Sequence, residues 1–248
     1  MPTELLILSL AAFIVGMSKG GLTAAGALAV PLLSIWMDPL MAAGTLLPVY
    51  IASDLVGIYI YRRGASWPNV KILVFGAALG IAIAVVAAPY LPREVITLFT
   101  GLIGLSYCSH AAIQVWRKKT QSAEFRSAPG IIWGALVGLT SFISHNGAPP
   151  FHAFVMPQRL SNLAFAATAT WTFTAVNLIK LPAYAGVGLG EALRHPKLPI
   201  LISIAIIGAF CGRFLVGWLP PRIYMMIIQT LLFLVSNYLC VISVIALV

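Results

Sequence analysis

Long apolar runs separated by short polar loops make up most of this chain. A membrane-spanning helix needs about 20 apolar residues at a rise of about 1.5 Å per residue, so every run is long enough to cross a bilayer. The runs cover residues 5–37, 41–61, 70–90, 94–116, 129–157, 162–190, 198–218 and 222–247. Six of these eight runs predict one helix each, and Pro182 with its nearby glycines should end the helix of run 162–190 early. The pattern predicts an all-α, polytopic integral membrane protein.

The runs 5–37 and 129–157 differ from the others because turn-forming residues interrupt them. Ser18-Lys19-Gly20-Gly21 breaks the first run, and Ser144-His145-Asn146-Gly147-Ala148-Pro149-Pro150 breaks the second. Each run is too long for one membrane helix and too short for two full crossings. We therefore expect each to form two half-helices around a non-helical bend, and we expect the two bends to face each other near mid-membrane.

The chain also contains two related halves. Residues 128 positions apart (195 − 67) match in several places, and so do residues 123 positions apart (177 − 54). The matched pairs are Trp67-Pro68 with His195-Pro196, Gly80 with Gly208, Leu91-Pro92 with Leu219-Pro220, Thr45 with Thr168, and Asp54 with Asn177. Each half is then one interrupted segment followed by three helices. The first half covers residues 1–116, a cytoplasmic linker covers 117–128, and the second half covers 129–248.

Composition agrees with a fold whose solvent is largely lipid. Of the 248 residues, 60% are hydrophobic and 8% are charged, whereas a soluble domain carries about 25% charged residues. The net charge of +9 comes from lysines and arginines in short loops, which is the pattern of a membrane protein rather than of a nucleic-acid binder. The 3 cysteines lie inside apolar runs without metal-site spacing, so we expect no metal and no other cofactor. The N-terminus lacks a basic region and a small-residue cleavage site, so we expect the first run to belong to the mature protein.

The basic loops predict the orientation of the chain. Loops 62–71 and 117–126 fall on one side and should be cytoplasmic, in a multi-pass protein of the cytoplasmic (inner) membrane. If each interrupted segment is re-entrant, the halves are inverted and the basic residues other than Lys19 and Lys180 split 10 inside to 3 outside. If each segment crosses once, the halves are parallel and the split is 9 to 4. We favour inverted repeats, because discontinuous segments paired across such a repeat are a common transporter design.

Lys19 is the first polar residue that needs a functional explanation, because a charge at membrane depth is costly. It lies in the first break, where its ammonium cannot easily reach the interface. Gly20 and Gly21 would allow the backbone to approach a ligand, and a helix starting after the break would point its positive dipole end at the same place. These features together predict an anion site. The alternative is that Lys19 pairs with a carboxylate such as Asp54.

The second break offers hydrogen-bond donors in Ser144, His145 and Asn146, followed by Gly147 and two prolines that force a non-helical path. We expect substrate contacts within residues 144–147. His145 is also a candidate for carrying a proton near neutral pH, although a buried histidine often serves only as a structural hydrogen-bonding group. His152 is interpreted as a packing residue.

Three further polar residues lie inside apolar runs. Asn177 and Lys180 share one face of a helix and are candidates for substrate binding. Because Lys180 precedes Pro182, where the helix should end, its alternative role is to extend into water at the membrane surface. Asp54 is the one acidic residue far inside an apolar run, and it either neutralises Lys19 or exchanges a proton.

The residues of the two breaks and several flanking motifs resemble those of the TauE/SafE family of membrane permeases, which export sulfite and small organosulfonates. The matching stretches are Gly16-Met17-Ser18-Lys19-Gly20-Gly21 with Pro31, Leu46-Leu47-Pro48 with Asp54-Leu55, Tyr61-Arg62-Arg63, Ser144-His145-Asn146-Gly147-Ala148-Pro149-Pro150-Phe151, Met156-Pro157-Gln158-Arg159-Leu160 and Asn177-Leu178-Ile179-Lys180-Leu181-Pro182. They extend over nearly the whole chain. The resemblance implies a secondary transporter that exports a small sulfur-containing anion.

Other classes of protein fit less well. An enzyme would need paired carboxylates, H-E-x-x-H or a Ser-His-Asp set, and the 6 acidic residues are scattered. A channel should show pore-lining polar residues along several helices, whereas here polarity is concentrated at the two breaks. A carrier of another anion such as a carboxylate, or an anion channel, remains the alternative function. The expected partners are a small anionic substrate and membrane lipid, with a homodimer left open.

Overall fold

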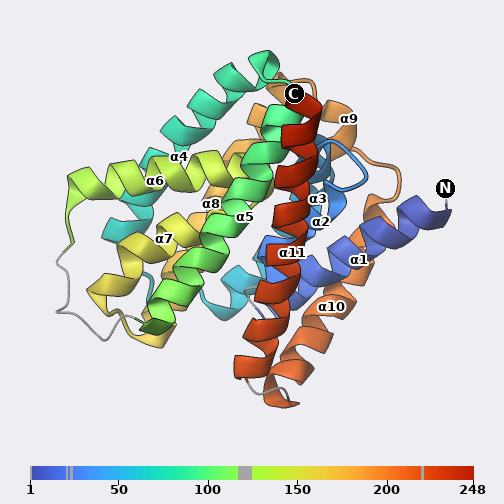
Figure 1. Cartoon of the computed structure of the whole chain (residues 1–248). Helices are drawn as coiled ribbons and strands as arrows, with labels where there is room; N and C mark the ends of the chain where they lie inside the picture. The colour runs from blue at the N-terminus through green and yellow to red at the C-terminus, as the bar shows by residue number, and fades with distance from the viewer. Residues whose placement is uncertain (1, 21, 23–24, 117–124, 219–220) are drawn as a thin grey trace.

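The computed structural model describes residues 2–20, 22, 25–116, 125–218 and 221–248, and every regular element within them is helical. The elements in chain order are α1 Pro2–Lys19, α2 Gly26–Leu33, α3 Pro39–Ile60, α4 Trp67–Ala87, η2 Ala88–Tyr90, α5 Arg93–Trp116, α6 Ser127–Ser144, α7 Ala148–Val155, η3 Met156–Gln158, α8 Asn162–Gly186, α9 Gly190–Leu193, α10 Leu198–Trp218 and α11 Pro221–Leu247. The predicted all-α class is confirmed (Figure 1).

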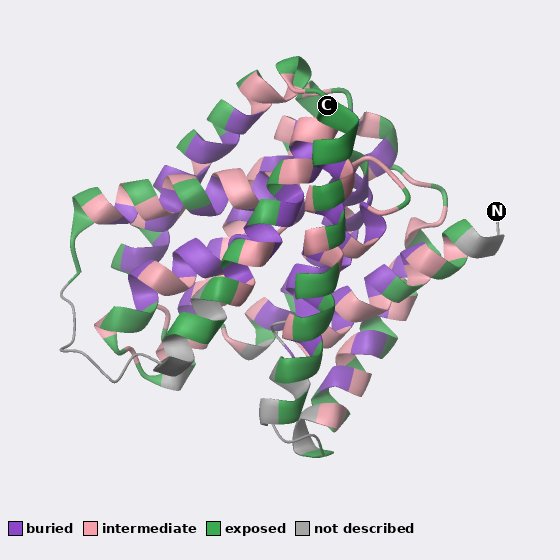
Figure 2. Cartoon of the chain, viewed as in Figure 1, coloured by how far each residue is buried: buried purple, intermediate pink, exposed green. Residues whose placement is uncertain are grey.

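Five of the described helices are long and apolar enough to cross a membrane. They are Pro39–Tyr59, Trp67–Tyr90, Ser127–Ser144, Leu198–Leu215 and Met226–Leu247. Their outward faces carry exposed leucine, isoleucine, valine and phenylalanine, which Figure 2 shows along the length of α11. In water such a surface would be unfavourable, whereas hydrocarbon solvates it well.

Both predicted interruptions are present. α1 ends at Lys19 and α2 begins at Gly26, while α6 ends at Ser144 and α7 begins at Ala148. His145 adopts a left-handed conformation (φ 53°) as the C-cap of α6, a backbone state in which histidine is enriched among non-glycine residues. The second break therefore ends α6 directly before His145, whose left-handed backbone conformation stops the helix. The linker predicted for 117–128 lies mostly outside the described residues, and α6 already begins at Ser127.

The prediction that Pro182 ends its helix early is wrong. α8 runs to Gly186 with Pro182 inside it. Proline removes one intrahelical hydrogen bond, but tertiary contacts hold the turn that follows. Tyr184 is fully buried, packs edge-on against the Phe142 ring at 4.8 Å and donates a 2.5 Å hydrogen bond to the Phe142 carbonyl. The short helix α9, which follows the glycines, was not predicted.

Helices α1 and α10 cross with their backbones almost in contact. A Cβ added at Gly16 would overlap the carbonyl oxygen of Ala205, and one added at Gly208 would overlap that of Phe13. Small residues four apart allow such close crossings between membrane helices, where packing replaces the hydrophobic effect as the driving force. The first half-helix of the chain is thus held by a helix from its far end.

Helices α4 and α6 cross in the same way. A Cβ at Gly80 would overlap the Ala135 carbonyl, and one at Gly138 would overlap the Ala77 carbonyl. Gly80 is the sequence match of Gly208, so the two crossings involve equivalent positions of the two predicted halves. Each half therefore supplies the helix that packs against the interrupted segment of the other.

Helices α5 and α11 lie side by side and run in opposite directions, as the colours in Figure 1 show. Gly101 of α5 packs against Cys240 of α11, and Gly104, one turn later, packs against Ser236, one turn earlier. α5 and α11 are sequence counterparts at the offset of 128. Counterpart helices that run antiparallel are what a two-fold axis perpendicular to both would produce.

Hydrogen bonds join the α3–α4 connection and the start of α4 to the first turns of α8 and to η3 at one end of the molecule. The backbone N–H of Ser66 donates to Thr168 Oγ1 at 2.9 Å. The amides of Asn69 and Gln158 bond reciprocally at 2.9 and 3.0 Å, which ties the start of α4 to η3. These contacts fix which loops share this end.

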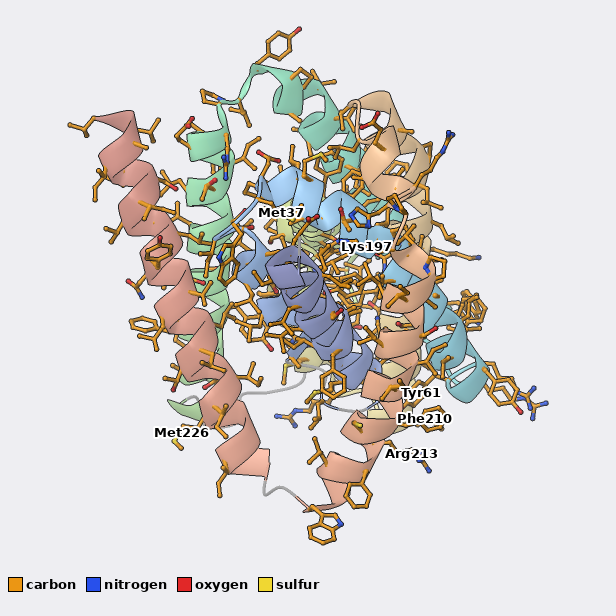
Figure 3. The ribbon with its side chains drawn as sticks, turned by 90° about the vertical axis from the view of Figure 1, so that its right-hand side faces the viewer. Met37, Tyr61, Lys197, Phe210, Arg213 and Met226 are labelled. Carbon is orange, nitrogen blue, oxygen red and sulfur yellow. The ribbon has the colours of Figure 1, made fainter. Side chains whose placement is uncertain are left out.

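The residues labelled in Figure 3 show which loops lie toward each end of the helix bundle. Tyr61 and Arg213 lie in its lower half, whereas Met37 and Lys197 lie in its upper half. Tyr61 is followed directly by the exposed pair Arg62-Arg63. The end that carries this basic pair is therefore opposite to the end that carries the α2–α3 and α9–α10 connections.

Candidate functional site

Lys19 is the last residue of α1 and forms an ion pair with Asp54 on α3. Its Nζ lies 2.5 Å from Asp54 Oδ1, and the side chains are 22% and 2% exposed. The carboxylate partner that the sequence allowed as an alternative is therefore present. The ion pair neutralises Lys19, so this lysine alone does not give the site a net positive charge.

Asp54 also contacts its own sequence counterpart. Asn177 Nδ2 donates to Asp54 Oδ2 at 2.6 Å, and both residues are buried. One turn further along α3, Gly57 packs against Thr170 of α8, so the two helices run antiparallel here. Lys19, Asp54 and Asn177 thus form one connected chain of polar side chains across α1, α3 and α8.

Lys180 is completely buried, and the alternative that it extends into water is wrong. α8 continues beyond Pro182, so Lys180 lies inside the helix rather than at its end. Its Nζ donates to Ser141 O at 3.1 Å and Ser141 Oγ at 3.0 Å, and it lies 2.6 Å from His145 Nδ1. A lysine has three N–H donors, so these neutral partners use all of them.

The contacts of His145 define its protonation state. An ammonium group can only donate, so Nδ1 must accept from Lys180 and carries no proton. Nε2 lies 2.8 Å from the Ala43 carbonyl, which can only accept, so Nε2 carries the ring proton. With Lys180 charged, His145 is therefore a neutral imidazole held at both nitrogens.

Tyr50 of α3 joins the two breaks, and the sequence reasoning did not identify it. Its ring stacks on His145 at 4.4 Å between centroids, and Lys19 Nζ lies 5.7 Å from the same centroid. Its hydroxyl donates to the Gly26 carbonyl at the start of α2 at 2.9 Å. The two bends therefore face each other across one aromatic ring. The available signal was a tyrosine in an apolar helix one turn before Asp54.

The remaining predicted residues divide into three groups. Ser144 is buried and its Oγ donates to Thr140 O at 3.3 Å, so it caps its own helix. Gly20 and Gly147 are explained by packing: a Cβ at Gly20 would overlap the α10 backbone, and one at Gly147 would crowd Val137 and Phe173. Gly21 lies outside the described residues. Their contact with substrate remains a prediction.

Asn146 differs from these residues because its side chain has no partner. It is 1% exposed, and neither Nδ2 nor Oδ1 forms a hydrogen bond within the described part of the chain. His152, six residues further along, packs with its ring 5.5 Å from the ring of Phe165, between centroids. Among the described residues no group of three or more His, Cys, Asp or Glu side chains could hold a metal.

The charged and titratable side chains between the two breaks, here called the centre, are those of Lys19, Asp54, His145 and Lys180. They comprise two lysines, one carboxylate and one imidazole. Lys19 and Asp54 neutralise each other, while the described partners of Lys180 are uncharged. With Lys180 protonated and His145 neutral, the sum of charge is +1. An uncompensated ammonium at membrane depth is unfavourable, so the arrangement can stabilise a bound anion.

Comparison with known proteins agrees with this chemistry. The family model described as Sulfite exporter TauE/SafE matches residues 8–239 of the chain. No curated protein and no solved structure matched.

Proposed function

Because the chain belongs to the sulfite exporter TauE/SafE family of membrane transporters, we propose that it exports a small sulfur-containing anion, sulfite or an organosulfonate, as a secondary transporter. The family is one of transporters and not of enzymes. The substrate binds between the two breaks, in contact with residues of the set Lys19, Gly20, Gly21, Ser144, His145, Asn146, Gly147, Asn177 and Lys180.

One observation carries this proposal: a buried lysine whose hydrogen-bond partners are all uncharged. Lys180 is 0% exposed and its three N–H groups contact Ser141 and His145 only. An anion about 6 Å away would interact with this ammonium by a few kcal/mol at an effective dielectric constant of about 20. The charge of Lys180, rather than that of the neutralised Lys19, supplies the main attraction.

Asp54 is the coupling residue of the proposed transport cycle. It is the carboxylate that holds Lys19, and its protonation would release that lysine toward the anion. His145 was the other candidate, but both of its nitrogens are already committed. Asp54→Asn should therefore keep anion exchange between two loaded compartments and lose the dependence of net export on a pH gradient, as measured in proteoliposomes.

We further propose that the halves are inverted repeats in the cytoplasmic membrane. The antiparallel course of α5 against α11, and the equivalent crossings of α1 with α10 and α4 with α6, support a two-fold axis in the membrane plane. The end with Arg62-Arg63 is cytoplasmic and the N-terminus lies outside. The interrupted segments then enter from opposite sides and meet at Tyr50.

Binding to the detergent-purified protein tests the function. Sulfite and isethionate should raise the free energy of unfolding by about 2.7 kcal/mol at 100 times Kd, and acetate at equal concentration should not. Lys180→Met should weaken sulfite binding about 10- to 100-fold, because it removes the uncompensated charge. Lys197→Met removes a half-buried lysine just before α10 that forms no hydrogen bond or ion pair with the two breaks in the described part of the chain, and it should leave binding unchanged.

The outcomes separate the alternatives. Binding of carboxylates without sulfite would identify a carboxylate carrier, and flux that never saturates with concentration would identify an anion channel. Failure of every anion to bind a monodisperse sample would refute the proposal. Equal losses in both lysine variants would show that the effect reflects overall charge and not the site.

A further inference from the structure

Asn146 provides information about the substrate that the charges alone do not. Its amide is buried at the second break, one residue after the imidazole that contacts Lys180 and one before the N-cap of α7. Both the donor end and the acceptor end are without partners in the described chain. The assignment of N and O in an amide is interchangeable, but here both ends are free, so the argument is the same either way.

The nearby groups cannot satisfy this amide. All three N–H donors of Lys180 are in use, and the Nε2–H of His145 points to Ala43. The first turn of α7 contributes little, because Pro149 and Pro150 have no N–H and the N–H of Phe151 bonds to Gly147. A buried amide must hydrogen-bond somewhere in the working cycle, so its partner is a molecule that enters the site.

An oxyanion alone would use only half of the amide. Its oxygens accept from Nδ2, but its lone pairs would repel the lone pairs of Oδ1. Oδ1 needs a donor, and the ligand must bring it. The net charge of +1 that the centre carries with Lys180 protonated sets the second condition, because a dianion would leave one negative charge uncompensated in a region of low dielectric.

We infer that the substrate is a singly charged sulfur oxyanion that carries its own hydroxyl group, such as hydrogensulfite or a hydroxyalkanesulfonate. This inference rests on the proposed function and narrows it. Nδ2 of Asn146 donates to a sulfonyl oxygen, and Oδ1 accepts from the hydroxyl. Dianions such as sulfate, and sulfonates without a donor, are discriminated against at this residue.

A matched pair of ligands tests this specificity. Isethionate (2-hydroxyethanesulfonate) and ethanesulfonate have the same charge and differ in one hydroxyl. Titration of the full-length protein should give isethionate an affinity about tenfold or more above ethanesulfonate, and above sulfate. Asn146→Leu should remove the preference by lowering isethionate to the level of ethanesulfonate. Asn237→Leu, the same substitution on α11, should preserve it.

Titration with sulfite at several pH values is a second test. Hydrogensulfite loses its proton near neutral pH and becomes a dianion without a hydroxyl, so the affinity of the protein for sulfite should fall as the pH rises through neutrality. Isethionate keeps its charge and hydroxyl throughout and corrects for any titration of the protein.

Several results would overturn the inference. Equal affinities for isethionate and ethanesulfonate in the parent protein, or a preference that survives in Asn146→Leu, would show that water and not substrate satisfies the amide. Sulfate binding as tightly as isethionate would overturn the charge rule. If Asn146→Leu fails to fold, the ligand pair on the parent still decides. Failure of all sulfur anions to bind would instead refute the proposed function.

Discussion

Replacing Asp54 by asparagine should make the protein less stable and, at the same time, a better anion binder. The substitution keeps the size of the side chain and its contact with Asn177, but it removes the charge that lies 2.5 Å from Lys19 Nζ. The charge of the centre rises from +1 to +2, because neither lysine then has a carboxylate. The stability and the affinity therefore change for the same reason.

The size of the stability loss follows from the ion pair. Removing one partner of a buried pair costs about 3–5 kcal/mol, and the 22% exposure of Lys19 places this pair at about 2–3 kcal/mol. For a chain of this length each kcal/mol lowers the unfolding midpoint by about 2–4 °C, so a fall of about 4–12 °C is expected. The measurement is thermal unfolding in detergent without added anion.

The gain in affinity follows from the released lysine. A charge-assisted hydrogen bond contributes about 1.5–3 kcal/mol, so an anion that takes the place of Asp54 on Lys19 should bind about 10- to 100-fold more tightly. Saturating sulfite should therefore restore most of the lost stability. The variant should show a larger stabilisation by anion than the parent.

Asp38→Asn is the matched control. Asp38 caps the N-terminus of α3 by accepting from the backbone of Leu40 and Met41, and asparagine caps as well as aspartate. The same change of charge outside the centre should leave both quantities nearly unchanged. If Asp54→Asn folds and binds anion more weakly than the parent, the carboxylate does not compete with substrate for Lys19, and this reasoning fails.

Three further changes test separate parts of the structure. Gly208→Ala should cost about 1–3 kcal/mol of unfolding free energy by overpacking the α1–α10 crossing, whereas Gly186→Ala, with no atom within 4 Å of the added Cβ, should cost nothing; equal effects would contradict the crossing. In intact cells, Lys197→Cys should react with an impermeant maleimide and Arg62→Cys only after permeabilisation; the reverse pattern would invert the topology. Tyr50→Phe should cost about 1 kcal/mol through the lost bond to the α2 carbonyl while anion affinity stays unchanged, because the ring still stacks on the imidazole; loss of binding would assign the hydroxyl to the site.

The sequence was a reliable guide to the helices and a partial guide to the site. Apolar runs bounded by loops predicted the helix limits closely, and the turn residues around Lys19 and Asn146 located both breaks. The surroundings of Lys180 could not be predicted, because the local effect of Pro182 indicated a helix end and only the burial of Tyr184 overrides it. Local propensity is weaker than tertiary packing in such cases.

The contact between Asp54 and Asn177 shows a different limit. Their match at an offset of 123 was visible in the sequence, but a match in sequence does not say whether two counterparts touch. The same holds for the crossings of α1 with α10 and α4 with α6. The glycines four apart were present in the sequence, and their spacing is the signal that would have predicted close helix packing.

The exchange of crossing partners between the halves has a consequence for biosynthesis. Gly16 of α1 packs against Ala205 of α10, so the first half-helix to leave the ribosome lacks its neighbour until nearly the whole chain has been made. During that interval the glycine face of α1 is unpacked, and the insertion machinery or lipid headgroups must contact this face and the charge of Lys19. The order of synthesis therefore makes α10 the helix that completes the surroundings of α1, and a chain truncated before it would lack the surface against which Gly16 packs.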